Sequence, residues 1–196
     1  MIFRIGNHLR LTGQLNYAWN KDELQYVQTT TSPNDALTSP IYVMGNMKQQ
    51  TYGLTLNLQA NLTPDISIQY YGSPFTSIAR YNDFKNANQT ESRTHRERFT
   101  PIEVTKFQRE DGDYYIGTGE GAPLFKNPDF SFNEFRSNLV ARWEYLPGST
   151  FYLVWEHNRG NSDQIYRPGW GNNIDRMWNL ASTNTFMMKI NYWFGL

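Results

Sequence analysis

The stretch FRSNLVARWEYLPGSTFYLVWEHNR, residues 135–159, decides the fold class, because it alternates apolar and polar residues on both sides of a turn signal. In its first arm, five apolar residues fall on one side of an extended chain: Phe135, Leu139, Ala141, Trp143 and Tyr145. A three-residue loop of Pro147, Gly148 and Ser149 would pair Tyr145 with Phe151 and continue the apolar set on the same face of the second arm. The stretch predicts an antiparallel β-hairpin with one apolar and one polar face.

The same period of two recurs elsewhere in the chain, in residues 3–19, 50–62, 66–72 and 184–196. Residues 50–62 and 66–72 are joined by a second short turn, LTPDI, which would pair Leu62 with Ile66. Long connections of about residues 20–49, 82–134 and 159–184 alternate with these short turns. We therefore expect an all-β, antiparallel fold of about six strands.

The composition limits the classes of function. Hydrophobic residues make up 39% and aromatic residues 16% of the chain, and the mean hydropathy is −0.67, which suits sheet surfaces better than a large aliphatic core. Lys plus Arg and Asp plus Glu both number 18, so no net field attracts nucleic acid, and we expect no nucleic-acid partner. The absence of cysteine excludes disulfides and thiolate metal sites.

Strands with one apolar face, joined alternately by short turns and long loops, are typical of outer-membrane β-barrels. Hydrocarbon offers no hydrogen-bond partner to the backbone, so only helices and closed sheets cross it. The prediction is a transmembrane β-barrel in contact with outer-membrane lipid, with the short turns and the C-terminus on the periplasmic side and the long loops outside. A soluble β-sandwich also alternates and uses hairpins, and a carbohydrate-binding module of that fold stays as an alternative.

Six strands are too few to close such a barrel, because bacterial single-chain barrels begin at about eight. We expect residues 1–196 to be one region, the C-terminal part of a larger barrel, or less simply a subunit that closes by oligomerising. The last segment, NTFMMKINYWFGL, sets apolar residues at every second position from Phe186 to Leu196. It looks like the strand that closes the cylinder and that the barrel-assembly machinery reads.

Three parts of the sequence carry a family resemblance. They are QYYGSPFTSIARYNDFK at residues 69–85, the stretch 135–159 quoted above, and the ending KINYWFGL. They resemble the C-terminal region of an uncharacterised family of Gram-negative envelope proteins. In that family a carbohydrate-binding-like β-sandwich of the family-nine type precedes a large domain of unknown function. The resemblance implies an outer-membrane barrel with a link to glycan binding or uptake at the cell surface, and it supplies no catalytic residues.

An acidic loop, REDGDYYIGTGEG at residues 109–121, contains the only candidates for catalysis, Asp111, Asp113 and Glu120. Glycoside hydrolysis needs two carboxylates roughly 5–10 Å apart, so a membrane-anchored hydrolase is an alternative function. Exposed loops are commonly acidic and Gly-rich, however, so the interpretation leans against an enzyme. Asp111 and Asp113 could hold calcium, but the pattern of a dedicated site is missing, and the three histidines lack ligand spacing, so we expect no cofactor and no metal.

Four aromatic residues in the expected outer loops are candidates for ligand binding: Tyr114, Tyr115, Trp170 and Trp178. Flat rings stack on the apolar faces of sugars, while nearby polar side chains bond to hydroxyl groups. The alternative is that these rings plug the barrel mouth or pack loop against loop.

Six charged residues are expected to face the lumen: Arg10, Arg136, Arg142, Glu144, Glu156 and Lys189. Because both signs occur together, the set suits cross-bracing of the wall better than conduction. Arg142 and Glu144 stand one pleat apart on the same face and could form such a brace.

Overall fold

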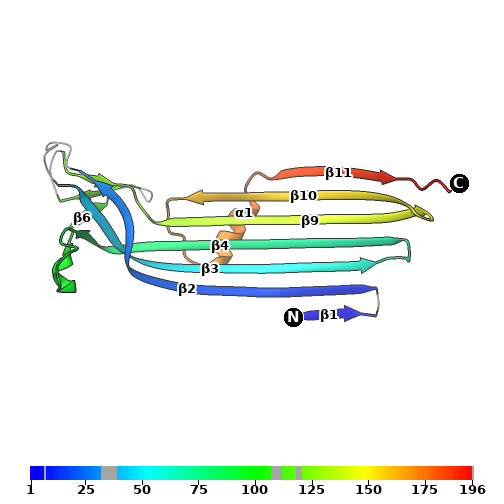
Figure 1. Cartoon of the computed structure of the whole chain (residues 1–196), viewed down its shortest axis with the longest axis horizontal. Helices are drawn as coiled ribbons and strands as arrows, with labels where there is room; N and C mark the ends of the chain where they lie inside the picture. The colour runs from blue at the N-terminus through cyan, green and yellow to red at the C-terminus, as the bar shows by residue number, and fades with distance from the viewer. Residues whose placement is uncertain (7, 32–38, 107–111, 118–120, 196) are drawn as a thin grey trace.

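The computed structural model describes the chain except for residues 7, 32–38, 107–111, 118–120 and 196, and its main feature is one broad antiparallel sheet (Figure 1). Along this sheet the strand order is β1-β2-β3-β4-β9-β10-β11. The seven strands are β1 (Ile2–Ile5), β2 (Leu9–Thr30), β3 (Ile41–Asn61), β4 (Ile66–Ala87), β9 (Phe130–Leu146), β10 (Ser149–Asp163) and β11 (Thr183–Asn191). The antiparallel all-β fold is confirmed, and the sheet is open, with β1 and β11 at opposite edges.

Shorter elements lie at the end of the sheet away from the tight turns (Figure 1). A second, three-stranded sheet has the order β6-β7-β8, and β5 pairs with the end of β4. These elements are a 3-10 helix η1 (His95–Arg98), β5 (Phe99–Pro101), β6 (Val104–Lys106), β7 (Tyr114–Ile116) and β8 (Leu124–Phe125). The one α-helix of the described chain, α1 (Trp170–Trp178), lies between β10 and β11 in sequence.

The expected single strand over residues 3–19 was wrong, because the chain folds back within it. Phe3 pairs with Leu11 across a turn at Gly6, whose φ of 56° favours glycine. Alternation alone did not show this reversal, since the residues on both sides of the turn keep the same apolar parity. The sheet accordingly has seven strands in its order rather than six.

Several strands run much further than alternation predicted. β2 continues to Thr30 and β3 begins at Ile41, so much of the expected connection 20–49 is strand. Likewise β4 ends at Ala87, and β10 ends at Asp163. Register shifts interrupt the β2–β3 pairing beyond Asp22 and the β3–β4 pairing beside Gly45, and each shift disturbs the period-two pattern on which the prediction depended.

The two predicted hairpins differ in how well their register was foreseen. Leu62 donates its N–H to the carbonyl oxygen of Ile66 at 2.9 Å, and the β3–β4 pairing continues in that register, as predicted. In the second hairpin the pairing of Tyr145 with Phe151 was wrong: Phe151 pairs with Trp143. A bulge at Ser149 follows a tight turn and displaces the register by two residues, which preserves the faces.

The registers give the sheet two chemically distinct faces. On the apolar face, one row of neighbouring residues crosses six strands: Leu11, Leu58, Tyr70, Leu139, Trp155 and Phe186. One residue along, the polar face has the row Thr12, Asn57, Tyr71, Asn138, Glu156 and Thr185. The predicted separation of apolar and polar residues therefore holds along these two rows, whereas Ser137 and His157 lie on the apolar face, and Val140 and Val154 on the polar face.

Much of the apolar face is open. Leu15 is 73% exposed and Met188 is 75% exposed. The accessible surface of the chain is 13325 Å², whereas a compact soluble protein of this mass would expose about 9,600 Å². The sheet therefore leaves a large apolar area uncovered.

Helix α1 covers one part of this face, behind β4, β9 and β10 in the view of Figure 1. Trp170 at its start stacks on Tyr52 with ring centroids 6.1 Å apart, and Trp178 at its end packs against Phe135 at 4.7 Å. No helix in the described part of the chain is long and apolar enough to cross a membrane.

Beyond the register shifts, the ends of β2, β3 and β4 bend away and, with β5 to β8, build what we call the distal lobe (Figure 1). Its core consists of Val43, Phe84 and Phe125, all buried. The bulge in β4 contains Asp83, whose φ of 50° is unusual for a residue other than glycine. The bulge brings the Phe84 ring over Gly45, where a Cβ would lie 3.1 Å from the ring.

Candidate functional site

A cavity of about 650 Å³ lies in the distal lobe. One wall is the bulged part of β4 from Arg80 to Lys85. The other lining residues are Pro101, Ile102, Val104, Lys106, Tyr114 and Asp129. A regular strand can present only alternate side chains to one side. The bulge at Asp83 breaks that alternation and lets consecutive residues of β4 border one cavity.

Asp129 is the buried charged group of this cavity, with 5% of its surface exposed. One carboxylate oxygen accepts the N–H of Tyr81 at 2.7 Å, and the other lies 3.9 Å from Nζ of Lys106. Burial raises the pKa of the Asp129 carboxyl above its ordinary value, although the Tyr81 N–H and the nearby cations act in the opposite direction. Asp129 is therefore held in place and still offers acceptor lone pairs at the cavity.

Tyr114, one of the predicted ligand-binding rings, forms part of the cavity wall. Its ring stacks on Phe125 at 5.3 Å and contacts Phe84 at 5.0 Å, while Nζ of Lys106 lies 5.5 Å from its centroid. Burial, and then the charge of Asp129, raise the pKa of the Tyr114 hydroxyl. The Tyr114 ring therefore packs within the distal lobe, which is the kind of loop packing that the alternative prediction gave, and the residue also borders the cavity. Its neighbour Tyr115, in the same strand β7, is half-buried.

The candidate carboxylates of the acidic loop are only partly described. Asp111 and Glu120 lie outside the described residues. Asp113 accepts the backbone N–H of Asn127 at 3.2 Å, which ties β7 to the segment before β9. Catalysis or calcium binding by this loop stays a prediction, and among the described residues no group of three or more His, Asp or Glu could hold a metal ion.

The other two predicted rings, Trp170 and Trp178, lie together at a different place. They stand at the two ends of α1 and border a groove of about 470 Å³ between the helix and the apolar face. Side chains of β3, β4 and β9 form its floor, among them Leu56, Pro74 and Phe135. Three of the four aromatic candidates therefore border two separate sites, Tyr114 one of them and Trp170 and Trp178 the other.

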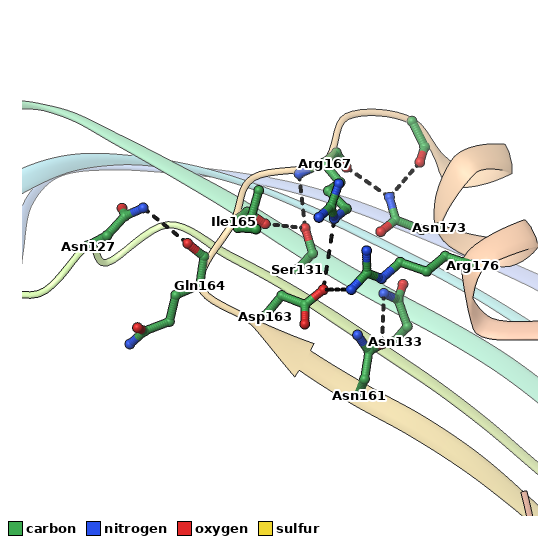
Figure 2. A network of polar contacts seen from close by, with 11 residues as sticks. Asn127, Ser131, Asn133, Asn161, Asp163, Gln164, Ile165, Arg167, Asn173 and Arg176 are labelled. Carbon is green, nitrogen blue, oxygen red and sulfur yellow. Dashed lines mark hydrogen bonds and ion pairs between the residues drawn. The ribbon is translucent and has the colours of Figure 1, made fainter. Parts of the chain in front are cut away.

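A polar network that the sequence did not reveal fixes α1 to the sheet (Figure 2). At its centre, Asp163 at the end of β10 forms ion pairs with Arg176 of the helix and, at 3.8 Å, with Arg167. Ser131 of β9 donates its hydroxyl proton to the carbonyl of Ile165 at 2.6 Å and accepts the Arg167 N–H at 2.9 Å. No spacing rule links these residues, because they meet only once β9, β10 and the connection to α1 are assembled.

The start of the helix is fixed by one fully buried side chain. Asn173 donates to the carbonyl oxygens of Arg167 and Gly169 at 2.8 and 2.7 Å (Figure 2). At the other end, Arg159 of β10 donates to the carbonyl oxygen of Trp178 and places its guanidinium 5.1 Å from that ring. Hydrogen bonds therefore hold both ends of α1 in place against the sheet.

All six charges expected to face a lumen lie on the polar face: Arg10, Arg136, Arg142, Glu144, Glu156 and Lys189. Arg142 donates to Glu144 at 2.6 Å, and Arg136 donates to Glu134 at 2.7 Å. Each of these pairs joins two residues of the same strand β9, so they brace side chains along a strand rather than across the wall.

A family model described as "Domain of unknown function (DUF5916)" matches residues 1–195. No curated protein and no solved structure matches the chain.

Proposed function

The chain belongs to the family described as Domain of unknown function (DUF5916), and from its two-faced sheet we propose that it is a segment of an outer-membrane β-barrel. The observation that supports this most is the apolar row across six strands, from Leu11 to Phe186. Water would oppose exposure of so continuous an apolar surface, whereas hydrocarbon accepts it. The polar face, with its paired charges, then faces the lumen.

The arrangement of the ends supports an orientation. Trp143 and Trp193 lie at the ends of the strands near the short turns, and rings of this kind collect where hydrocarbon meets water. The short turns and the C-terminus are periplasmic in this proposal, and the distal lobe lies on the outer side.

Further strands complete the barrel. The outer edges of β1 and β11 carry backbone groups that no strand of the described chain pairs, and hydrocarbon would leave such groups unsatisfied. Strands from a longer chain, or from a second copy, would satisfy them. We propose that β11 is also the strand that the barrel-assembly machinery engages.

At the cell surface the protein serves glycan binding or uptake. The resemblance to envelope proteins that carry a carbohydrate-binding-like sandwich supports a glycan link, and the distal cavity supplies a concave place for a ligand. Its volume falls within the range of about 300–1,000 Å³ that is usual for small-molecule sites.

Single cysteines test the membrane assignment cleanly, because the chain has none of its own. Leu15→Cys and Gln14→Cys place labels on the apolar and polar faces of β2 at nearly the same height. The protein, refolded into vesicles with a fluorescent label, is then titrated with lipids that carry a quencher in their acyl chains. We expect strong quenching for Leu15→Cys and weak quenching for Gln14→Cys.

Orientation is tested on intact cells with a membrane-impermeant maleimide. Glu91→Cys in the distal region should react, and Asp65→Cys in the short β3–β4 turn should react only after the outer membrane is opened. Equal, weak quenching at both positions of β2, together with a soluble monomer in the absence of detergent, would refute the barrel.

A further inference from the structure

We propose that the distal cavity binds an acidic saccharide, one that carries a carboxylate. This inference rests on the proposed glycan function and names the class of glycan. Neither Asp113 nor the rings of α1 are among its lining residues.

The charges at the cavity favour an anionic ligand. Arg80, Lys85 and Lys106 border it, against two carboxylates, Asp83 and Asp129. Among the described residues, neither Arg80 nor Lys85 forms an ion pair within 4.0 Å, although the Arg80 guanidinium lies 5.9 Å from the centroid of the Tyr166 ring, and Lys106 is 3.9 Å from Asp129. The cavity thus has cations that are not fully used by the protein, and a carboxylate forms strong charge-assisted hydrogen bonds with such groups.

The remaining lining suits the other parts of a sugar. Asp129 is fixed by the Tyr81 N–H, so its remaining lone pairs can accept hydrogen bonds from hydroxyl groups without a cost for ordering the side chain. Ile102, Val104 and Tyr114 give the cavity an apolar lining, against which the C–H face of a pyranose can lie. Cations, a fixed acceptor and an apolar patch within one cavity match a uronic acid better than a neutral sugar or a simple anion.

The test measures binding by calorimetry with the full chain in detergent micelles. The probes are a short oligogalacturonate, a neutral galactose oligomer of equal length, and acetate. The variants Arg80→Gln and Lys106→Gln remove single cations from the cavity. Arg136→Gln is the matched control, because Arg136 lies on the polar face, paired with Glu134 and outside the cavity.

We expect the oligogalacturonate to bind at least about tenfold more tightly than the neutral oligomer, and each cavity variant to weaken it by about 10- to 100-fold, the usual effect of losing one charged hydrogen bond. The control should bind as the unmodified protein does. Equal binding of the neutral oligomer, acetate competing as well as the oligogalacturonate, or unchanged binding in both cavity variants would overturn the inference. Absence of oligogalacturonate binding by protein that passes the quenching test would overturn it and leave the barrel standing.

Discussion

The substitution Leu58→Arg separates a membrane-facing sheet from a soluble one. Leu58 lies on the apolar face of β3, four residues before Leu62 at the turn. At about 3.3 Å per residue and a strand tilt of about 40°, it stands about 10 Å from the turn along a barrel axis. That position is close to the middle of an apolar band about 25 Å tall, where a lipid-facing arginine costs about 2–4 kcal/mol.

Two matched variants control for the face of the sheet and for the depth in the membrane. Gln59→Arg places an arginine at the next residue of β3, which lies on the polar face of the sheet. It should change the free energy of unfolding by about 0.5 kcal/mol or less. Leu62→Arg places an arginine on the apolar face beside the β3–β4 turn, near the membrane–water interface. It should lower the free energy of unfolding by only about 0–1 kcal/mol. The assay is reversible guanidinium unfolding of protein in lipid vesicles, followed by tryptophan fluorescence. Equal effects of Leu58→Arg and Gln59→Arg, within about 0.5 kcal/mol, would refute the reasoning.

Three further outcomes are expected. Gly45→Ala should destabilise the distal lobe by about 1 kcal/mol, because its Cβ would lie 3.1 Å from the ring of Phe84. In the control Gly171→Ala, in α1, the new Cβ meets nothing within 4 Å, so this variant should be neutral or stabilising. Amide hydrogen exchange of each region measures both effects. Burial raises the pKa of Asp129, so the folded state binds its proton more readily than the unfolded state and stability rises as the pH falls through that raised pKa; Asp129→Asn should therefore be the more stable protein at pH 7 in denaturant titrations, with an advantage that shrinks in acid. Asp163→Asn should loosen α1 by about 1–2 kcal/mol, since two arginines lose their partner, and increase quenching of helix tryptophans by aqueous acrylamide; unchanged quenching would contradict the anchoring role.

Alternation in the sequence determined the class of fold and the chemistry of the two faces. Side chains of a strand point to opposite sides with a period of two, and this local geometry needs no knowledge of the neighbours. The pairing of Leu62 with Ile66 could also be predicted from the sequence, because a short turn fixes the register of its own hairpin. The error at Tyr145 shows the limit: a bulge moves the register by two residues without changing any face.

The distal lobe and the position of α1 were decided only by the tertiary structure. The lobe depends on register shifts in β2, β3 and β4, which interrupt the period on which sequence reasoning relies. Asp129 meets Lys106 and the Tyr81 N–H from three separate segments, and Asp163 meets Arg176 across a connection and a helix. Local spacing fixes which way each side chain of a strand points, whereas contacts between distant segments depend on how those strands bend and where the chain returns.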